Sequence, residues 1–132
     1  MPLDLSVMYH AEQLSDKDLF KQINLTESDY IRLTKDFPSI GFEIDGKCVG
    51  GMIVRNNRIH LSVLPDYHGK WGWLFTPAFK WAFAVNDPLY AYVSRDNEKV
   101  LRFIRRHDWK KVNQIQSTII FELTDLTTRY PL

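Results

Sequence analysis

The chain has 132 residues and a mass of 15.6 kDa, and its 45% hydrophobic and 25% charged content fits one globular domain spanning residues 1–132 and excludes a largely disordered chain. Seventeen basic against sixteen acidic side chains leave a net charge of +1, which argues against sequence-specific nucleic-acid binding and against attraction to an anionic membrane. The single cysteine, Cys48, cannot form an internal disulfide, and no apolar run approaches the ~18 residues of a membrane helix, so we expect a cytoplasmic protein.

The first third of the chain is predicted to contain one strand and two helices. Residues 5–9 alternate weakly between apolar and polar side chains, which favours a strand. Ser15 and Asp18 then open a short helix that reaches about residue 23. Thr26 is a suitable N-cap and is followed by acidic residues, so a second helix is expected from there until Pro38 stops it.

The pattern then changes to an antiparallel meander. Three strand-like runs follow one another at residues 40–44, 48–54 and 59–64. The intervening pairs Asp45-Gly46 and Asn56-Asn57 tolerate the left-handed conformations of tight hairpin turns. Gly50 and Gly51 interrupt the middle run, which indicates either a bulge or a close approach of another segment to the backbone.

Helices and strands alternate in the remainder of the chain. Apolar residues recur at helical spacing from about residue 72 to 86, with Pro77 acceptable in a first turn. Residues 89–93 and 117–123 favour strands, and residues 97–107 favour a helix whose inward face holds Val100, Leu101 and Ile104. The order is β-α-α-β-β-β-α-β-α-β, an α/β fold with a mixed sheet in which the fourth and fifth strands are parallel.

The segment between the fourth strand and the next helix holds the strongest candidate site. Its sequence, VLPDYHGKWGW, spans residues 63–73 and contains two glycines, Gly69 and Gly72. Free backbone N–H groups and the positive end of a helix can together bind an anion. His68 and Lys70 add side chains able to make charge-assisted hydrogen bonds to a phosphate, and without such a ligand they are solvated loop residues.

The element order, a V-x-P-x-x-x-G-K turn after the fourth strand and an N-x-x-x-L-R-F helix after the fifth resemble the GNAT N-acetyltransferase superfamily. The resemblance covers about residues 5–123 and implies a single GNAT-like domain whose central mixed sheet is split between strands 4 and 5. In that family the split receives acetyl-CoA and the following loop holds its pyrophosphate. The residues implied in cofactor binding here are Val63, His68, Gly69, Lys70, Trp71, Gly72, Trp73 and Asn97.

The sequence departs from the family pattern at the loop and in the last helix. Trp71 and Trp73 stand where the family has glycine or alanine, and two indoles crowd the space in which the backbone approaches pyrophosphate. Ile104 replaces the tyrosine that protonates the leaving thiolate in the family. Because general acid catalysis is typically worth ~10² to 10⁴ in rate, its loss slows acyl transfer without preventing it.

A GNAT enzyme also needs a group that removes a proton from the acceptor ammonium. The candidate catalytic residues are His60, on the fourth strand ahead of the loop, and Glu43, on the second strand. Imidazole titrates in the useful pH range, which favours His60. For both residues the alternative is a surface or hydrogen-bonded side chain without a catalytic role. The histidines lack metal-ligand spacing, so no metal site is predicted.

The resemblance implies an N-acyltransferase that moves an acetyl or other acyl group from acyl-CoA to an amine of a small molecule or a protein by direct attack. The run N-x-x-x-L-R-F-I-R also resembles GNAT-like proteins of short-tailed bacteriophages. This leaves open a catalytically degenerate GNAT-fold protein of phage origin that binds a protein partner or resides in the virion. Lys99, Arg102 and Arg106 form a basic helix face that can bind the 3′-phosphate of CoA, RNA or a protein.

Overall fold

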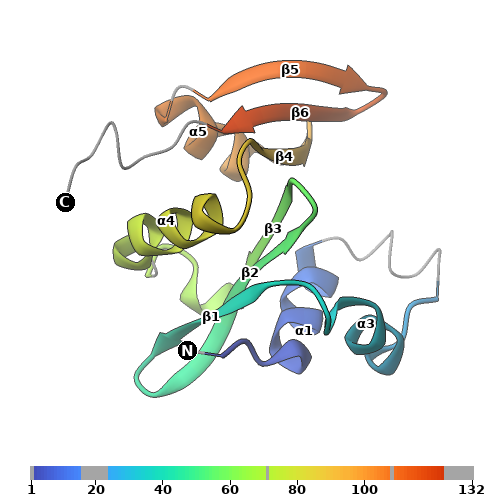
Figure 1. The fold of residues 1–132 in the computed structure, drawn as a ribbon, viewed down its shortest axis with the longest axis vertical. Coiled ribbons are helices and arrows are strands. Elements are labelled where there is room, and N and C mark those ends of the chain that lie inside the picture. Colours follow the sequence, from blue (N-terminus) through green and yellow to red (C-terminus); the bar gives the residue numbers. More distant parts are fainter. Residues whose placement is uncertain (1, 16–23, 71, 108, 124–132) are drawn as a thin grey trace.

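The computed structural model describes residues 2–15, 24–70, 72–107 and 109–123. One six-stranded sheet runs through this part of the chain in the order β1-β2-β3-β4-β6-β5 (Figure 1). Its strands are β1 (Ser39–Ile44), β2 (Lys47–Arg55), β3 (Arg58–Val63), β4 (Leu89–Ser94), β5 (Lys110–Ile115) and β6 (Thr118–Leu123). The helices are α1 (Leu5–Ser15), α3 (Glu27–Thr34), α4 (Phe75–Val85) and α5 (Glu98–Arg106), and two short 3-10 turns are η1 (Pro65–Tyr67) and η2 (Gly72–Leu74).

The predicted meander is confirmed as β1, β2 and β3, paired antiparallel in succession. Both residues of the first turn are left-handed, with φ angles of 53° at Asp45 and 77° at Gly46, and the second turn places Asn56 at 56°. Asn, Asp and Gly adopt these conformations at low cost, which is why the sequence predicts both turns.

Gly50 and Gly51 of β2 accompany both a bulge and a close approach of another strand, the two alternatives that the sequence indicated. The register with β1 shifts beside it, with Val49 as the extra residue of a bulge. A Cβ atom added at Gly50 would also lie 2.3 Å from the Ser62 carbonyl oxygen and 2.7 Å from the Val63 Cα of β3. Glycine therefore lets β3 approach the middle strand closely at the end that leads into the loop.

The prediction of a strand at residues 5–9 is wrong, because this segment belongs to helix α1. The residues that α1 buries, Met8, Tyr9 and Ala11, recur at helical and not at strand spacing, and they pack against the sheet and α3. Burial of these residues therefore outweighs the weak alternation of apolar and polar side chains that favoured a strand. The short helix predicted at residues 15–23 lies largely outside the described residues.

Strand β5 is an element that the sequence did not reveal. All six of its residues are exposed, so it has no alternation of buried and exposed positions. It is defined by antiparallel pairing with β6, interrupted by a register shift between Lys111 and Asn113 that leaves Val112 as an extra residue. Since β5 ends the order of strands, its other edge is not paired with any strand of the described chain.

Side-chain caps start α3 and α5, and the Asp4 carboxylate accepts the Ser6 N–H at the start of α1 at 3.0 Å. Thr26 begins α3 with a capping box, in which its hydroxyl accepts the Asp29 backbone N–H at 3.1 Å and the Asp29 carboxylate receives the Thr26 N–H. Asn97 caps α5. Leu101 and Ile104 of α5 are buried as predicted, but Val100 is 37% exposed, so its predicted inward position is wrong. Val100 precedes Leu101 by one residue, about 100° around the helix.

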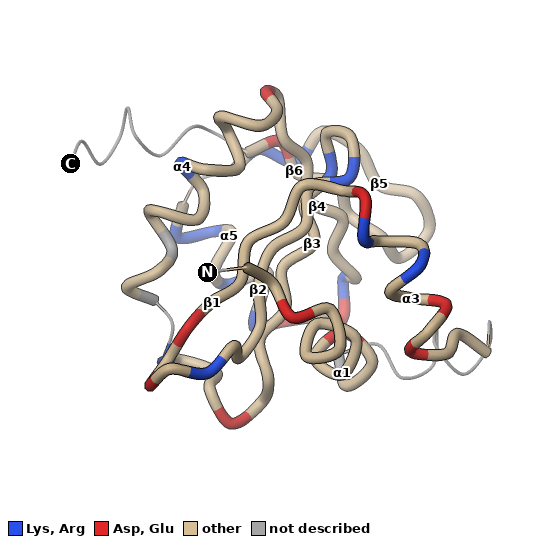
Figure 2. The backbone as a smooth tube through the Cα atoms, turned by 60° about the horizontal axis from the view of Figure 1, so that its bottom comes forward, with Lys and Arg blue, Asp and Glu red and all other residues tan. Residues whose placement is uncertain are grey.

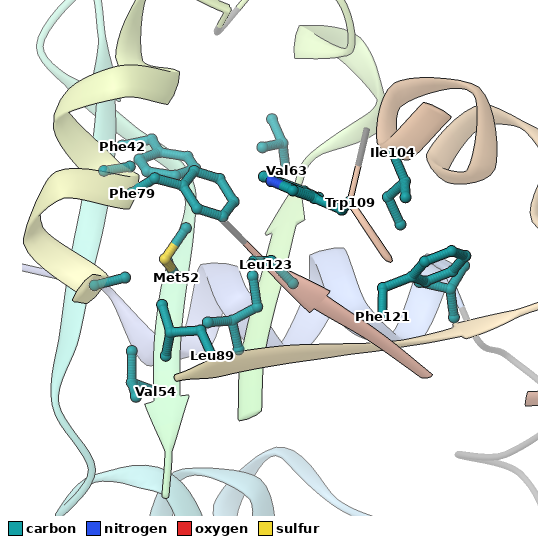
Figure 3. Close-up of a cluster of buried hydrophobic side chains, with 14 of the residues drawn as sticks. Phe42, Met52, Val54, Val63, Phe79, Leu89, Ile104, Trp109, Phe121 and Leu123 are labelled. Atoms are coloured by element: carbon teal, nitrogen blue, oxygen red, sulfur yellow. The ribbon is translucent and has the colours of Figure 1, made fainter. Parts of the chain in front are cut away.

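The two faces of the first three strands belong to separate cores. Met52, Val54, Ile59 and Val63 join the larger core, formed with α4, α5, β4 and β6 (Figure 3). Ile53 faces the other way and packs with Met8, Tyr9 and Tyr30 of α1 and α3. His60 pairs directly with Ile53 across the β2–β3 ladder, which places its side chain on this second face.

Within the described residues, no helix combines the length and the apolar character needed to cross a membrane.

Candidate functional site

The sheet is split between β3 and β4, the fourth and fifth strands of the prediction, as the resemblance to the GNAT superfamily implies. The two strands are parallel, and among the described residues Arg58 and Tyr90 are their only paired positions. The Tyr90 backbone N–H also donates to the Asn57 carbonyl at 2.7 Å, which fixes this end. Beyond it, β3 pairs only with β2 as far as Val63, and β4 pairs only with β6. The strands therefore diverge toward their carboxyl ends, where the loop to α4 begins.

Trp109 packs beneath this divergence. Its side chain is 7% exposed and belongs to the same core as Val63 (Figure 3). The indole ring lies 5.3 Å from the ring of Phe79 in α4 and 5.9 Å from that of Phe103 in α5, measured between centroids. Trp109 thus connects the two helices that flank the split, at spacings typical of favourable aromatic pairs.

The loop after β3 folds back on itself. The N–H groups of Tyr67, His68 and Lys70 donate to carbonyls within residues 64–67, and Gly69 is left-handed with φ 82°. The Nε2 atom of His68 lies 2.8 Å from the Val63 carbonyl oxygen, so it is the nitrogen that carries the proton. In the neutral ring only an Nδ1 lone pair then remains, and His68 can donate to a phosphate only when doubly protonated.

The start of α4 has some, but not all, of the features of an anion-binding site. Its N-cap position, Leu74, provides no side-chain hydrogen bond, which leaves the first N–H groups of the helix available. Pro77, in the first turn, lacks an N–H group and removes one of these donors. Gly72 opens the turn η2, Lys70 is exposed and Trp73 is 67% exposed, whereas Trp71 lies outside the described residues. The Trp73 ring therefore projects toward solvent.

Asn97 is exposed, and its Oδ1 accepts the Val100 N–H at 3.3 Å. The side-chain oxygen is thus committed to capping α5, while the Nδ2 donor can still contact a ligand. Ile104, at the place of the family's tyrosine, is 2% exposed and packs in the larger core.

The two candidate bases lie at different places. Glu43 is exposed on β1, two strands away from β3, and lines a hollow of about 590 Å³ with Trp73, Leu74 and the 45–46 turn. His60 lies on β3 itself, with its side chain 28% exposed on the face covered by α1. Burial, together with the charges of Arg58 and Arg55, lowers the pKa of His60 to about 4. Its imidazole is therefore neutral at physiological pH and a weak base.

A carboxylate that the sequence did not single out lies beside His60. The Oε1 atom of Glu12 is 3.9 Å from His60 Nδ1, and the Glu12 side chain is 18% exposed. Burial raises the pKa of Glu12, opposed by a hydrogen bond from Tyr30 and by the charge of Arg58. The usable signal was an acidic residue on the apolar stripe of an amphipathic helix, one turn after Met8, and the wrong strand prediction concealed it.

The basic residues of α5 gather around a second hollow. Lys99, Arg102, Arg105 and Arg106 line a space of about 550 Å³, which confirms that the basic positions identified in the sequence share one face. Elsewhere on the backbone, acidic and basic positions are scattered (Figure 2). The described residues hold no group of three or more His, Cys, Asp or Glu side chains arranged to bind a metal ion.

No protein-family model matches the sequence, and no curated protein does. Solved structures match over 89% of the chain. PH1933 from Pyrococcus horikoshii is similar with a TM-score of 0.66, 15% identity and 86% of its own length covered. The PaiA N-acetyltransferase from Thermoplasma acidophilum, solved in complex with coenzyme A, gives a TM-score of 0.62, 16% identity and 88% coverage. A protein from Bordetella pertussis described as a GNAT-family acetyltransferase gives 0.62, 14% and 88%.

The split mixed sheet and these structural neighbours define a GNAT-fold protein. The resemblance seen in the sequence is thereby confirmed at the level of the fold. Identities of 14–16% show a shared fold and do not by themselves transfer an activity.

Proposed function

We propose that this protein is an N-acyltransferase that transfers an acetyl or other acyl group from acyl-CoA to an amine of a small molecule or a protein. The observation that carries the proposal is the split between β3 and β4, which are joined at Arg58 and Tyr90 and diverge toward the loop that precedes α4. A fold neighbour, PaiA, was solved with coenzyme A, which supports a CoA-type ligand for this arrangement.

In this proposal the cofactor is held by the backbone and by a few side chains. The N–H groups of Gly69, of residues 72–74 and of the first turn of α4 bind the pyrophosphate, with the Lys70 side chain adding a charge-assisted hydrogen bond. The Nδ2 atom of Asn97 aligns the pantetheine arm. The basic face of α5 is available for the 3′-phosphate.

The reaction is direct attack of the amine on the thioester. A base removes a proton from the acceptor ammonium, the nitrogen attacks the carbonyl carbon, and the C–S bond breaks. Of the two candidates that the sequence singled out, His60 lies on the strand that borders the split, whereas Glu43 lies on β1. Ile104 is buried in the core and has no proton to donate, so water protonates the leaving thiolate. This protonation is slower than protonation by the tyrosine of the family.

The competing function is a non-catalytic GNAT-fold protein that binds another protein, with the phage origin that the sequence resemblance implied. The observation in its favour is the hydrogen bond between His68 and the Val63 carbonyl, which occupies the end of β3 at the mouth of the split. The buried Trp109 side chain packs in the same core as Val63 and also fills space there. In such a protein the protein's own side chains take the place of a cofactor.

Titration of the purified protein with acetyl-CoA separates the two functions. The acyltransferase proposal expects binding heat and a higher melting temperature, since a ligand that prefers the native state stabilises it. Lys70→Ala is expected to weaken binding by about 10- to 150-fold, because a hydrogen bond to a charged group is worth ~1.5–3 kcal/mol. Lys47→Ala, which removes an equally exposed charge from β2, is the matched control and leaves binding unchanged.

Absence of both heat and a melting shift at millimolar acetyl-CoA would rule out the acyltransferase and leave the protein-binding function. If binding occurs, release of free CoA thiol in the presence of a panel of amines tests catalysis. Gly72→Trp is expected to abolish both binding and release by filling the start of η2.

A further inference from the structure

The buried face of α1 carries a carboxylate where an apolar residue is expected. Met8 is 0% exposed and Ala11 is 1% exposed, and Glu12 continues this stripe against the sheet. A carboxylate taken out of water costs free energy unless partners stabilise its charge. The surroundings of Glu12 therefore indicate what the residue is for.

The groups around Glu12 come from four other elements. His60 and Arg58 of β3 face it, and Tyr30 of α3 and Arg55 of β2 contribute to the same electrostatic environment. Tyr92 of β4 lies under the Arg58 guanidinium, 4.2 Å from ring centroid to Cζ. Arg58 is thus held by an aromatic ring and does not close on Glu12 as a direct ion pair.

Burial shifts the pKa values of Glu12 and His60 in opposite directions. Burial lowers the pKa of His60 to about 4 and raises the pKa of Glu12. A proton delivered between them therefore goes to the carboxylate rather than to the imidazole. The separation of 3.9 Å is longer than a direct hydrogen bond, so His60 does not consume the Glu12 oxygen that would receive the proton.

We infer that Glu12, and not His60 or Glu43, is the proton acceptor of the proposed acyltransferase, and that Glu12 and His60 together receive the ammonium group of a primary amine. The inference rests on the proposed function. In the step, an N–H bond of the ammonium breaks and an O–H bond forms on Glu12. The nitrogen lone pair forms the C–N bond to the thioester carbonyl, the C–S bond breaks, and the thiolate leaves with its electron pair and takes a proton from water.

The first test measures acyl transfer as a function of pH in wild-type protein, Glu12→Gln and His60→Gln. Loss of the base is expected to lower kcat/KM by ~100-fold or more in Glu12→Gln and to remove the fall in rate on the acid side of the profile. His60→Gln is expected to keep that acid-side fall with a smaller loss of rate. Glu122→Gln, which removes an exposed carboxylate from β6, is the matched control with unchanged kinetics.

The second test does not need turnover. The side-chain carboxyl resonance of Glu12 and the imidazole resonances of His60 are followed by NMR during titration with n-butylamine hydrochloride. We expect both to shift in wild-type protein, and the His60 shift to disappear in Glu12→Gln. If Glu12→Gln fails to fold, Glu12→Asp replaces it, and the wild-type titration still reports on the residue directly.

The outcomes distinguish the two proposals. If the wild type is active and Glu12→Gln retains its rate or its acid-side fall, the assignment of Glu12 is overturned and the acyltransferase stands. If the wild type neither binds acetyl-CoA nor releases thiol, the acyltransferase fails, and an amine-dependent shift that requires Glu12 would still establish the ammonium site. Absence of that shift in an inactive protein would overturn both.

Discussion

His60 shows how one residue's position fixes its charge. It lies on β3 facing α1, close to Arg58 and Arg55, and both burial and these like charges oppose its protonation. Its place on the strand was predictable, since it precedes the loop in a run with clear alternation. Its environment was not, because its pKa is lowered by burial under α1, whose position depends on the fold, and by Arg58 and Arg55 of β3 and β2.

The His60 environment predicts a pH dependence of stability. The folded-state pKa of about 4 lies below the ordinary value of 6.5, so the unfolded chain binds the extra proton first. The free energy of unfolding therefore decreases as pH falls from about 6.5 to about 4, by at most ~3 kcal/mol. Replacing His60 with Gln should remove this component, and urea denaturation across that pH range measures it.

Two features make the comparison specific. The exposed His10 provides the matched variant His10→Gln, which should keep the wild-type pH dependence. Glu12 works in the opposite direction, since its raised pKa adds stability as pH falls, so the difference between wild type and His60→Gln is the quantity to compare. Parallel curves for the two proteins would contradict the assignment.

At the scale of the elements, the helices, strands and turns that have a local sequence signal were predicted. The elements without such a signal were not. The turns with Asp45-Gly46 and Asn56 and the cap at Thr26 act through short-range backbone chemistry that is visible in the sequence. The predicted stop at Pro38 is four residues too late, because α3 ends at Thr34. The segment at residues 5–9 suits a strand as well as a helix, and burial of Met8 decided the outcome. Strand β5, exposed throughout, exists only through pairing with β6.

The capping box of α3 gives a prediction at this scale. Thr26→Ala leaves the Asp29 backbone N–H without its 3.1 Å acceptor, so the free energy of unfolding should fall by ~1 kcal/mol. Urea denaturation at neutral pH measures the change. Ser28→Ala in the same first turn is the control and should stay within ~0.5 kcal/mol of wild type. Equal losses in the two variants would show that the cap does not stabilise the helix.

At the scale of the whole molecule, Trp109 joins the two parts that flank the split sheet. Its ring meets Phe79 of α4 and Phe103 of α5 inside the core that also holds Val63. The split itself was implied by the resemblance to the GNAT superfamily. The aromatic side chain packed beside it was not predicted, since the sequence drew attention to the indoles of the loop, whereas the buried Trp109 comes from the segment before β5.

The role of Trp109 predicts a large effect of truncation. Trp109→Ala removes a 7% exposed ring from the core and should lower the free energy of unfolding by ~3–5 kcal/mol. Trp73→Ala, at a 67% exposed ring, should change it by less than ~0.5 kcal/mol. Both are measured by chemical denaturation followed by circular dichroism. A small loss at Trp109 would mean that the two parts are held together elsewhere.

The extra residue in β5 has a consequence for how copies of the molecule meet. A long, flat outer strand offers its unpaired N–H and C=O groups to another chain. Here Val112 breaks the register in mid-strand, and Lys110 and Lys111 place two like charges next to it. An incoming strand would meet a locally twisted backbone and a repelling pair of ammonium groups. The irregularity therefore protects the exposed border of the sheet against strand-by-strand growth into larger assemblies.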